Sequence, residues 1–514
     1  MNHSLSYVRT EDAPILKPPA NLVGVRGWVM ANLFPNWSNS ILTILAALFA
    51  YWVLSNVLGW ALFRATWTGE NRDACIVEGA GACWPFVQAK FAQWIYGFYP
   101  IDQRWRVNIC FLVGAAALIP LLMPSLPYKK WNALFLLFAF PLLALILLTG
   151  GHFSFGFGTF ISFVLQFLAI VAAFLPLTVF GIENGIKSAK PGLILVAVGL
   201  AIRALSYLLG FELPAIFNGA ATTYLIALVL MLAGGAWGIL QVFGAGQQAS
   251  RPVLRAWLSG GAGLCLVAIL LKWDFGLEYV ETSQWGGLLV TLVVAITGIV
   301  FSLPVGILLA LGRRSNMPIV KYFSIGFIEI WRGVPLITVL FMASYMLPLF
   351  LPPGTNFDKL TRVLIGIALF SSAYMAEVIR GGLQAIPRGQ YEAADAAGLG
   401  YWQTTGRIIL PQAMRLPYWN TMNLIVLPQA LRIVIPGIVN SFISLFKDTT
   451  LVTVVGLYDL MGIVIAGFAD AKWASAQTAP TGYFTAALLF WVFCFGMSRY
   501  SQYVERRLNT GHKR

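Results

Sequence analysis

The sequence predicts an all-α polytopic membrane protein, and three observations indicate this class. Of the 514 residues, 59% are hydrophobic and only 11% are charged, whereas soluble domains carry about 25% charged residues. Apolar runs recur along the chain, and each is long enough to cross a hydrocarbon core of about 30 Å as a helix. The basic residues behind the net charge of +14 are scattered between those runs, which is typical of membrane-protein loops rather than of a nucleic-acid-binding face.

About twelve membrane-spanning helices are expected from these runs. Their approximate ranges are 41–63, 107–123, 132–149, 159–181, 192–210, 222–243, 253–271, 287–311, 326–350, 363–383, 424–446 and 483–500. Loops with paired basic residues alternate with less basic ones, so both chain ends are expected to be cytoplasmic. The loop 64–105 is a basic exception on the other side, where its length of about 40 residues weakens the rule. No cleavable signal peptide is expected, because the first apolar run begins too late and is too long.

Four parts are expected along the chain, with the main division near residue 280. They are a cytoplasmic or interfacial N-terminal segment (1–40), a region of about seven spans with a long first external loop (41–280), a second membrane region (284–504) and a basic cytoplasmic tail (505–514). Residues 21–37 form either a helix on the membrane surface or a structural lead-in. Polar residues are rare in the first seven spans, so that region is expected to lie outside the substrate path. Arg203, in one of these spans, either marks a substrate path, or pairs with a polar neighbour or snorkels to the membrane interface.

Spaced motifs gather in the second membrane region. The segment 392–411, EAADAAGLGYWQTTGRIILP, has the spacing E-A-A-x3-G-x9-I-x-L-P. It is preceded by Ala376-Glu377-x2-Arg380-Gly381-Gly382 and by Ile386-Pro387-x-Gly389-Gln390, and it is followed by NSFISLFKDT over 440–449. Taken in this order, the motifs resemble the permease subunits of ABC importers, in the branch that takes up histidine, glutamate and glutamine. The resemblance covers residues 284–504.

This resemblance implies a permease core of five helices that imports polar or general L-amino acids across the bacterial inner membrane by alternating access. The implied partners are a dimer of ATPase subunits, a second permease subunit (related or identical), a periplasmic amino-acid-binding protein, the amino-acid substrate and membrane lipid. No cofactor and no nucleic-acid partner are implied. ATP hydrolysis is expected in a partner, because the glycine-containing segment 181–188 has the wrong spacing for a phosphate-binding loop.

In the resembled family, the segment 392–411 enters a cleft of the ATPase subunit. The residues expected to couple transport to ATP hydrolysis are Glu392, Ala393, Ala394, Gly398, Ile408, Leu410 and Pro411. A carboxylate at the start of a short helix interacts favourably with the positive end of the helix, and the alanines keep the helix slim. The glycine permits the turn that ends it, and the proline prevents the next segment from continuing the same helix.

Two glutamate–arginine spacings of three residues are candidates for a charged inner gate. Glu329 and Arg332, followed by Gly333 and Pro335, lie at the cytoplasmic end of one span, and Glu377 and Arg380 lie at that end of the next. Residues three apart share a helical face and can pair. Gly333 and Pro335 loosen the helix locally, which suits a gate. The alternative is that both pairs only anchor helix ends.

Substrate-path candidates are the polar residues at membrane depth within the second region, namely Thr291, Ser371, Ser372, Asn440 and Ser444. Asn440 is the strongest, because an amide in an apolar helix requires a partner. Serine and threonine often satisfy the backbone of their own helix instead. No catalytic residue and no metal site are expected, because the chain has only His3, His152 and His512.

The five cysteines differ in their position along the chain. On the external side of a bacterial inner membrane, Cys75 and Cys83 would form either a disulfide or two free thiols. Cys110, Cys265 and Cys494 lie inside apolar runs and are interpreted as small core residues.

Two other classes of function were considered. A secondary transporter would show two similar halves and carboxylates near the middle of the membrane, and this chain has neither. A multi-pass membrane enzyme would need a convergent set of His, Cys and acidic residues, and no such set is recognised in this sequence.

A tandem repeat follows the coupling segment. Residues 401–416, YWQTTGRIILPQAMRL, and 418–433, YWNTMNLIVLPQALRI, align at an offset of 17. An added helix of that length would measure about 25 Å, and its arginines and prolines disfavour a membrane crossing. The first copy is therefore expected to stay cytoplasmic and to lengthen the link between the coupling helix and the span 424–446.

Single cysteines placed at residues 405–420 test this arrangement. An impermeant thiol reagent should label them only from the cytoplasmic side, because an extra crossing would also invert the basic tail. Labelling from the periplasmic side would contradict the cytoplasmic placement.

Overall fold

The computed structural model describes the chain from residue 24 to residue 508 with several gaps. The described residues are 24–123, 126–151, 157–209, 222–244, 270, 275–315, 317–350, 358–384, 389, 392, 396 and 427–508. Every named element in them is helical, as predicted for an all-α protein, and β-pairing is confined to isolated bridges. The chain separates into two compact units, one of Met1–Phe91 with Ile465–Ala487 and the other of Ala92–Val464 with Leu488–Arg514. These units combine residues from both sides of the predicted division near residue 280.

Within the described residues, nine helices are long and apolar enough to cross a membrane. They are Trp37–Phe63, Ile101–Leu122, Trp131–Thr149, Ile186–Ser206, Thr223–Val242, Gly287–Arg313, Lys359–Gln384, Pro436–Val455 and Thr478–Arg506. A bent pair of helices, Pro318–Gly333 and Leu336–Leu349, makes a tenth span if it crosses as one. The prediction of a polytopic membrane protein is therefore confirmed. The expected span 253–271 lies outside the described residues apart from residue 270.

The first unit begins with α1 (Gly24–Asn32) and α2 (Trp37–Leu58), which continues into a π-helical turn, Gly59–Phe63. Asn36 caps α2, and its side chain accepts a hydrogen bond from the amide of Asn39. A short 3-10 turn, Arg72–Cys75, follows, and then α3 (Trp84–Tyr96). The same unit contains residues from the C-terminal part of the chain, between α19 (Leu460–Gly467) and the first turns of α20 (Thr478–Leu508).

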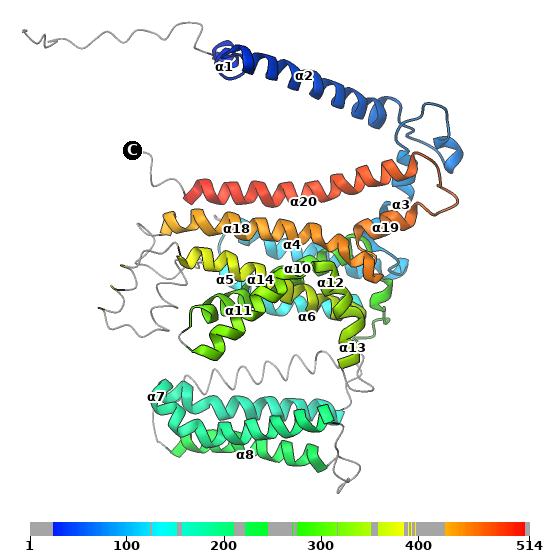
Figure 1. Ribbon diagram of the computed structural model, residues 1–514. Coiled ribbons are helices and arrows are strands. Elements are labelled where there is room, and N and C mark those ends of the chain that lie inside the picture. The colour runs from blue at the N-terminus through cyan, green and yellow to red at the C-terminus, as the bar shows by residue number, and fades with distance from the viewer. Residues whose placement is uncertain are drawn as a thin grey trace, which may run out of the picture. The chain divides into compact units, whose positions relative to one another are not determined.

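The second unit contains the remaining helices. They are α4 (Arg104–Leu122), α5 (Lys129–Leu134), α6 (Phe140–Thr149), α7 (Phe157–Leu209), α8 (Thr222–Gly244), α10 (Gly287–Arg313), α11 (Pro318–Gly333), α12 (Leu336–Phe341), α13 (Leu347–Phe350), α14 (Lys359–Gln384) and α18 (Leu427–Asp448), with most of α20 (Figure 1). The π-helical turns Phe135–Ala139 and Met342–Met346 join α5 to α6 and α12 to α13. α18 begins inside the second copy of the tandem repeat, and the first copy lies outside the described residues.

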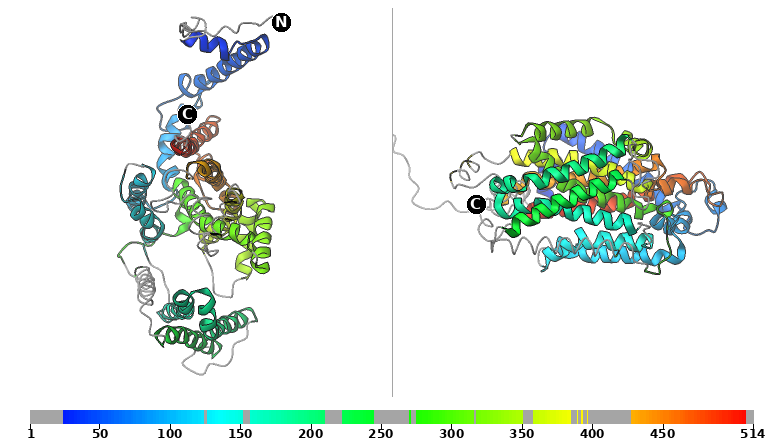
Figure 2. Two further views of the ribbon diagram at one scale, coloured as in Figure 1. Left: turned by 90° about the vertical axis from the view of Figure 1, so that its left-hand side faces the viewer. Right: turned by 90° about the horizontal axis from the view of Figure 1, so that it is seen from below.

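α7 and α8 pack through small residues. Gly234 and Gly235, adjacent on α8, lie against Gly192 and Ala169 of α7. These two residues of α7 would be about 35 Å apart along a straight helix, so α7 turns back on itself and places two segments beside α8 (Figures 1 and 2). The sequence predicted two spans over these residues. The guanidinium of Arg203 lies 4.8 Å from the ring centroid of Tyr224 on α8, a cation–π contact with an aromatic neighbour.

α10 and α14 form the centre of the second unit. A Cβ atom built on Gly306 of α10 would lie 2.9 Å from the Cβ of Met375 and 3.1 Å from the amide nitrogen of Ala376 on α14. Gly298, two turns earlier, faces Ile367 of α14 and Leu445 of α18 in the same way. Small residues allow such close approach of helix backbones inside a membrane, where burial of apolar surface drives association weakly. The glycines therefore set the spacing between α10, α14 and α18.

Replacement of Gly306 by alanine tests this packing. We expect the free energy of unfolding to fall by about 1–3 kcal/mol, because the new methyl group overlaps the backbone region of α14. Gly326→Ala on α11 is the matched control, since nothing lies within 4 Å of its added Cβ, and it should keep or raise stability by up to about 1 kcal/mol. Thermal unfolding of the two variants in detergent measures both effects. A control that lost as much stability as Gly306→Ala would contradict the packing argument.

Candidate functional site: a charge cluster beside a broken helix

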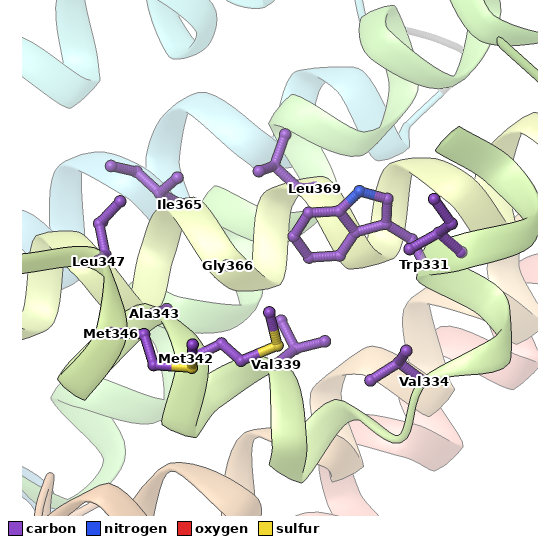
Figure 3. A pocket seen from close by; sticks show the side chains of 11 residues that line it. Trp331, Val334, Val339, Met342, Ala343, Met346, Leu347, Ile365, Gly366 and Leu369 are labelled. Carbon is purple, nitrogen blue, oxygen red and sulfur yellow. The ribbon is translucent and has the colours of Figure 1, made fainter. Parts of the chain in front are cut away.

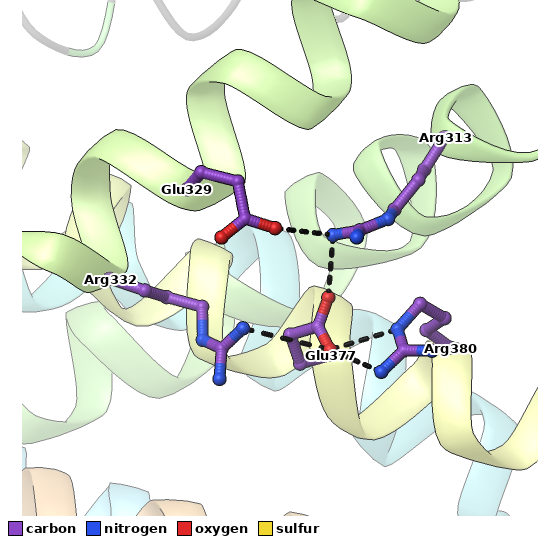
Figure 4. A network of polar contacts seen from close by, with 5 residues as sticks. All are labelled: Arg313, Glu329, Arg332, Glu377 and Arg380. Atoms are coloured by element: carbon purple, nitrogen blue, oxygen red, sulfur yellow. Dashed lines mark hydrogen bonds and ion pairs between the residues drawn. The ribbon is translucent and has the colours of Figure 1, made fainter.

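Five charged side chains meet at the ends of α10, α11 and α14. The carboxylate of Glu377 lies at the centre, with its Oε1 2.9 Å from the Nη1 of Arg313 and its Oε2 2.7 Å from the Nη2 of Arg380 (Figure 4). Arg332 approaches the same carboxylate at 3.7 Å, and Glu329 adds a second carboxylate 3.1 Å from Arg313. The cluster therefore joins three helices through one glutamate.

The arrangement differs from the two expected pairs. Glu377 and Arg380 pair within one turn of α14, as the spacing predicted. Glu329 pairs with Arg313 rather than with Arg332, because Arg332 points toward α14. Arg313 was not singled out in the sequence, where it belongs to a pair of basic residues at the end of a span. Only the approach of α10 to α14 reveals its partners.

The electrostatics of the cluster depend on Glu377. Its side chain is 15% exposed, whereas that of Glu329 is 57% exposed, so the central ion pairs are screened much less by solvent than the outer one. Three guanidinium groups share two carboxylates, and Glu377 alone contacts all three. The guanidinium of Arg332 also lies 5.8 Å from the ring centroid of Tyr374. An apolar core that includes Ile328 and Ile379, both fully buried, supports the same three helices.

Gly333 and Pro335 break the helix beside the cluster, as the sequence suggested. Val334 is extended, with φ −103° and ψ 134°, because a residue that precedes proline disfavours the helical conformation. α12 starts directly after Pro335, and the helical segments on the two sides of the break differ in direction by 105°. The bend places Arg332 at the end of α11, within reach of Glu377.

An apolar cavity of about 320 Å³ lies on the inner side of this bend (Figure 3). Side chains from both sides of the break and from α14 line it, including Trp331, Val334, Met342, Met346 and Leu369. Gly366 forms part of the wall, where an added Cβ would lie 3.1 Å from that of Ala343. The lining is hydrophobic, so the cavity suits an apolar side chain and offers no charged partner for an amino-acid zwitterion.

The five substrate-path candidates lie on three helices and have different environments. Thr291 is buried and donates to the carbonyl of Gly287, while its Oγ1 accepts from the amide of Leu460, so its hydroxyl joins α10 to α19. Ser372 bonds to the carbonyl of Ala368 in its own helix. Ser371 is buried, and its hydroxyl has no hydrogen-bond partner within the described part of the chain. Asn440 and Ser444 are exposed on one face of α18, as residues four apart should be.

The coupling segment lies almost entirely outside the described residues. Glu392 is helical and exposed, and the other six residues expected to couple to the ATPase, Ala393, Ala394, Gly398, Ile408, Leu410 and Pro411, are among those not described. In the loop after α2, Cys75 and Cys83 are joined in a disulfide. Cys110 and Cys494 are free thiols, the first of them buried. Across the described residues, no group of three or more His, Cys, Asp or Glu side chains could hold a metal ion.

A set of membrane-spanning helices with a broken helix and an ion-pair cluster at the helix ends defines a multi-span membrane protein. Comparison with known proteins identifies the family. Residues 302–416 and 412–510 match the family described as "Binding-protein-dependent transport system inner membrane component". The chain belongs to the amino-acid ABC transporter permeases of this family, which reside in the inner membrane and are transport subunits rather than enzymes.

Two relatives match almost the whole chain. The inner membrane amino-acid ABC transporter permease protein YhdY of Escherichia coli is 39% identical over 484 residues, which are 94% of this chain and 93% of the relative. The glutamate/glutamine/aspartate/asparagine transport system permease protein BztC of Rhodobacter capsulatus is 39% identical over 519 residues, 99% of each chain. The probable glutamine ABC transporter permease protein GlnP of Bacillus subtilis is 32% identical, but its match takes 43% of this chain and 92% of GlnP. GlnP therefore aligns with less than half of this chain.

Replacement of Glu377 tests the centre of the cluster. We expect Glu377→Gln to lower the free energy of unfolding by about 2–3 kcal/mol, because three guanidinium groups then lose their shared carboxylate. Glu329→Gln should cost less than about 1 kcal/mol, since it removes a single exposed pair. Unfolding of both variants in detergent provides the comparison. Equal losses would show that Glu377 is not the centre of the network.

Proposed function

We propose that this chain is the permease subunit of an ATP-driven importer for polar L-amino acids. The observation that carries the proposal is the full-length similarity to BztC, whose name specifies glutamate, glutamine, aspartate and asparagine. A second permease subunit (related or identical), an ATPase dimer and a periplasmic binding protein complete the proposed assembly. Both termini are cytoplasmic in this proposal, because the basic loops and the basic tail then lie on one side of the membrane.

Residues 392–411 couple the permease to the ATPase in this proposal. α14 ends at Gln384, just before this segment, and it carries Glu377 two turns upstream. A displacement of the coupling segment would therefore pull on the helix that holds the centre of the ion-pair cluster. The contacts of Glu377 with Arg313 and Arg332 cross between helices, so relative movement of α10, α11 and α14 breaks them.

The cluster acts as the inner gate of an alternating-access cycle in this proposal. With Glu377 in contact with all three arginines, the ends of α10, α11 and α14 are held together. When the coupling segment moves with the ATPase, water replaces the ion pairs between helices. The inner ends of α10, α11 and α14 then separate. The hinge is the break at Val334 and Pro335, where the backbone is already extended and Pro335 has no amide hydrogen to donate.

Uptake by intact cells tests both the function and the coupling. Cells that express the chain with its partner subunits should accumulate radiolabelled glutamate or glutamine, and unlabelled aspartate or asparagine should compete. Gly398→Asp should abolish uptake while the protein remains in the membrane, because a charged side chain there blocks seating in the ATPase. Gln502→Asp is the control, since it places the same charge on an exposed side chain outside residues 392–411, and uptake should be retained.

Two results would contradict the proposal. An absence of accumulation by the wild-type assembly for all four amino acids would reject the substrate class. Normal uptake by Gly398→Asp would reject the coupling role of the segment, whichever amino acid is carried.

A further inference from the structure

The loop after α2 packs against residues from the other end of the chain. We call residues 60–91 the external brace. Within the first unit, the amide of Cys83 donates to the Oγ1 of Thr481 at 2.9 Å, and the amide of Arg72 donates to the carbonyl of Lys472 at 2.8 Å. These partners are separated by about 400 residues in the sequence. Lys472 lies in the segment that leads into α20, and Thr481 lies in the first turn of α20.

Charged and aromatic side chains reinforce this contact. The Nζ of Lys90 lies 2.5 Å from the Oδ2 of Asp470, and the hydrogen bond from Lys90 lowers the pKa of that carboxyl below its ordinary value. The ring of Phe86 is fully buried between Phe468 and Trp473. Two tryptophans of the brace, Trp60 and Trp84, meet Phe484 on α20 edge to face, with ring centroids 5.5 and 6.4 Å apart.

The disulfide shapes the surface that meets α20. It closes the loop from Cys75 to Cys83, and backbone hydrogen bonds hold the end of that loop, from the amide of Gly81 to the carbonyl of Arg64 and from the amide of Ala82 to that of Trp60. A side chain at Gly81 would place its Cβ 2.1 Å from the carbonyl oxygen of Trp60. The chain is thereby fixed where the amide of Cys83 reaches Thr481.

The end of α3 is joined to a second helix of the core. Within the second unit, the backbones of Gly97 and Gly286 touch, and an added Cβ at Gly97 would lie 2.3 Å from the Cα of Gly286. Gly287, at the start of α10, lies equally close to the carbonyl of Trp94. Both Gly97 and Gly287 have positive φ, +67° and +63°, so other residues would strain the backbone there. α3 therefore connects the brace to the first helix of the core.

We propose that the external brace is a positioning element for transport, which fixes the outer ends of α10 and α20 in the permease core. α20 passes the constraint on, because Phe490 and Phe493 pack against Phe446 of α18, at centroid distances of 5.5 and 5.3 Å. α18 carries the exposed Asn440 and Ser444. The N-terminal region thus acts on the path without lining it. The proposal rests on the proposed import function.

Charge reversal across the brace tests the proposal in the complete assembly. Lys90→Asp and Asp470→Lys each place like charges together, and each should lower the maximal rate of glutamate uptake about fivefold or more. The double variant restores an ion pair and should return the rate to within about twofold of the wild type. The half-saturating concentration should stay unchanged, because the brace does not touch the substrate. Asp102→Lys is the control, since it reverses the charge of an exposed side chain outside the brace that contacts the neighbouring Gln103.

A second measurement uses the disulfide. The double variant Cys75→Ser, Cys83→Ser should show the same loss of maximal rate, and a membrane-impermeant reductant should produce it in the wild type but not in this variant. The amount of protein in the membrane is measured throughout. Unchanged uptake in the single reversals, or no recovery in the double reversal, would overturn the proposal. Loss of the protein from the membrane would show a role in folding only, and would overturn it as well. A wild type without uptake would instead reject the proposed import function.

Discussion

The close contact of α10 with α14 is the constraint on which the rest of the permease core depends. Gly306 brings the two helices together at backbone distance, and the contact places Arg313, at the end of α10, beside Glu377 of α14. A larger residue at Gly306 would separate the helices, and the 2.9 Å ion pair could not form. The ion-pair cluster is thus a consequence of helix packing, and its charges are brought together by residues that carry no charge.

The broken helix supplies the third side of the cluster. A continuous helix through residues 318–349 would run on beyond Arg332 in the direction of α11, whereas α11 ends at Gly333 and the next segment turns by 105°. The bend is local in origin, because Pro335 extends the residue before it. Its effect reaches further, since it aligns Arg332 with Glu377 and opens the apolar cavity on its inner side. One interruption of backbone hydrogen bonding therefore produces both the approach of Arg332 to Glu377 and the apolar cavity.

The external brace is proposed to act on the permease core from residues outside it. Within the first unit, its contacts fall on the start of α20 and on the segment before it. A buried disulfide and a half-buried ion pair both hold this region in place. The matches to YhdY and BztC cover 94% and 99% of this chain.

The sequence by itself determined the class, the permease family and several local features. Apolar runs of membrane-spanning length predict helices because the bilayer interior leaves backbone groups no other partners, and this holds whatever the packing. The pair Glu377–Arg380 and the break at Gly333–Pro335 are likewise local, since three-residue spacing and proline act within one turn. The order of spaced motifs around residues 376–449 was sufficient to indicate the permease family.

Only the tertiary structure decided which distant residues meet. Glu329 was expected to pair with Arg332 and instead contacts Arg313, because helix packing offered a partner that spacing along one helix cannot reveal. Thr291, a candidate for the substrate path, joins α10 to α19 for the same reason. The contact of Cys83 with Thr481 joins residues that no periodicity relates. Hydrophobic patterns specify which face of a helix is buried, but the partner of that face depends on the whole chain.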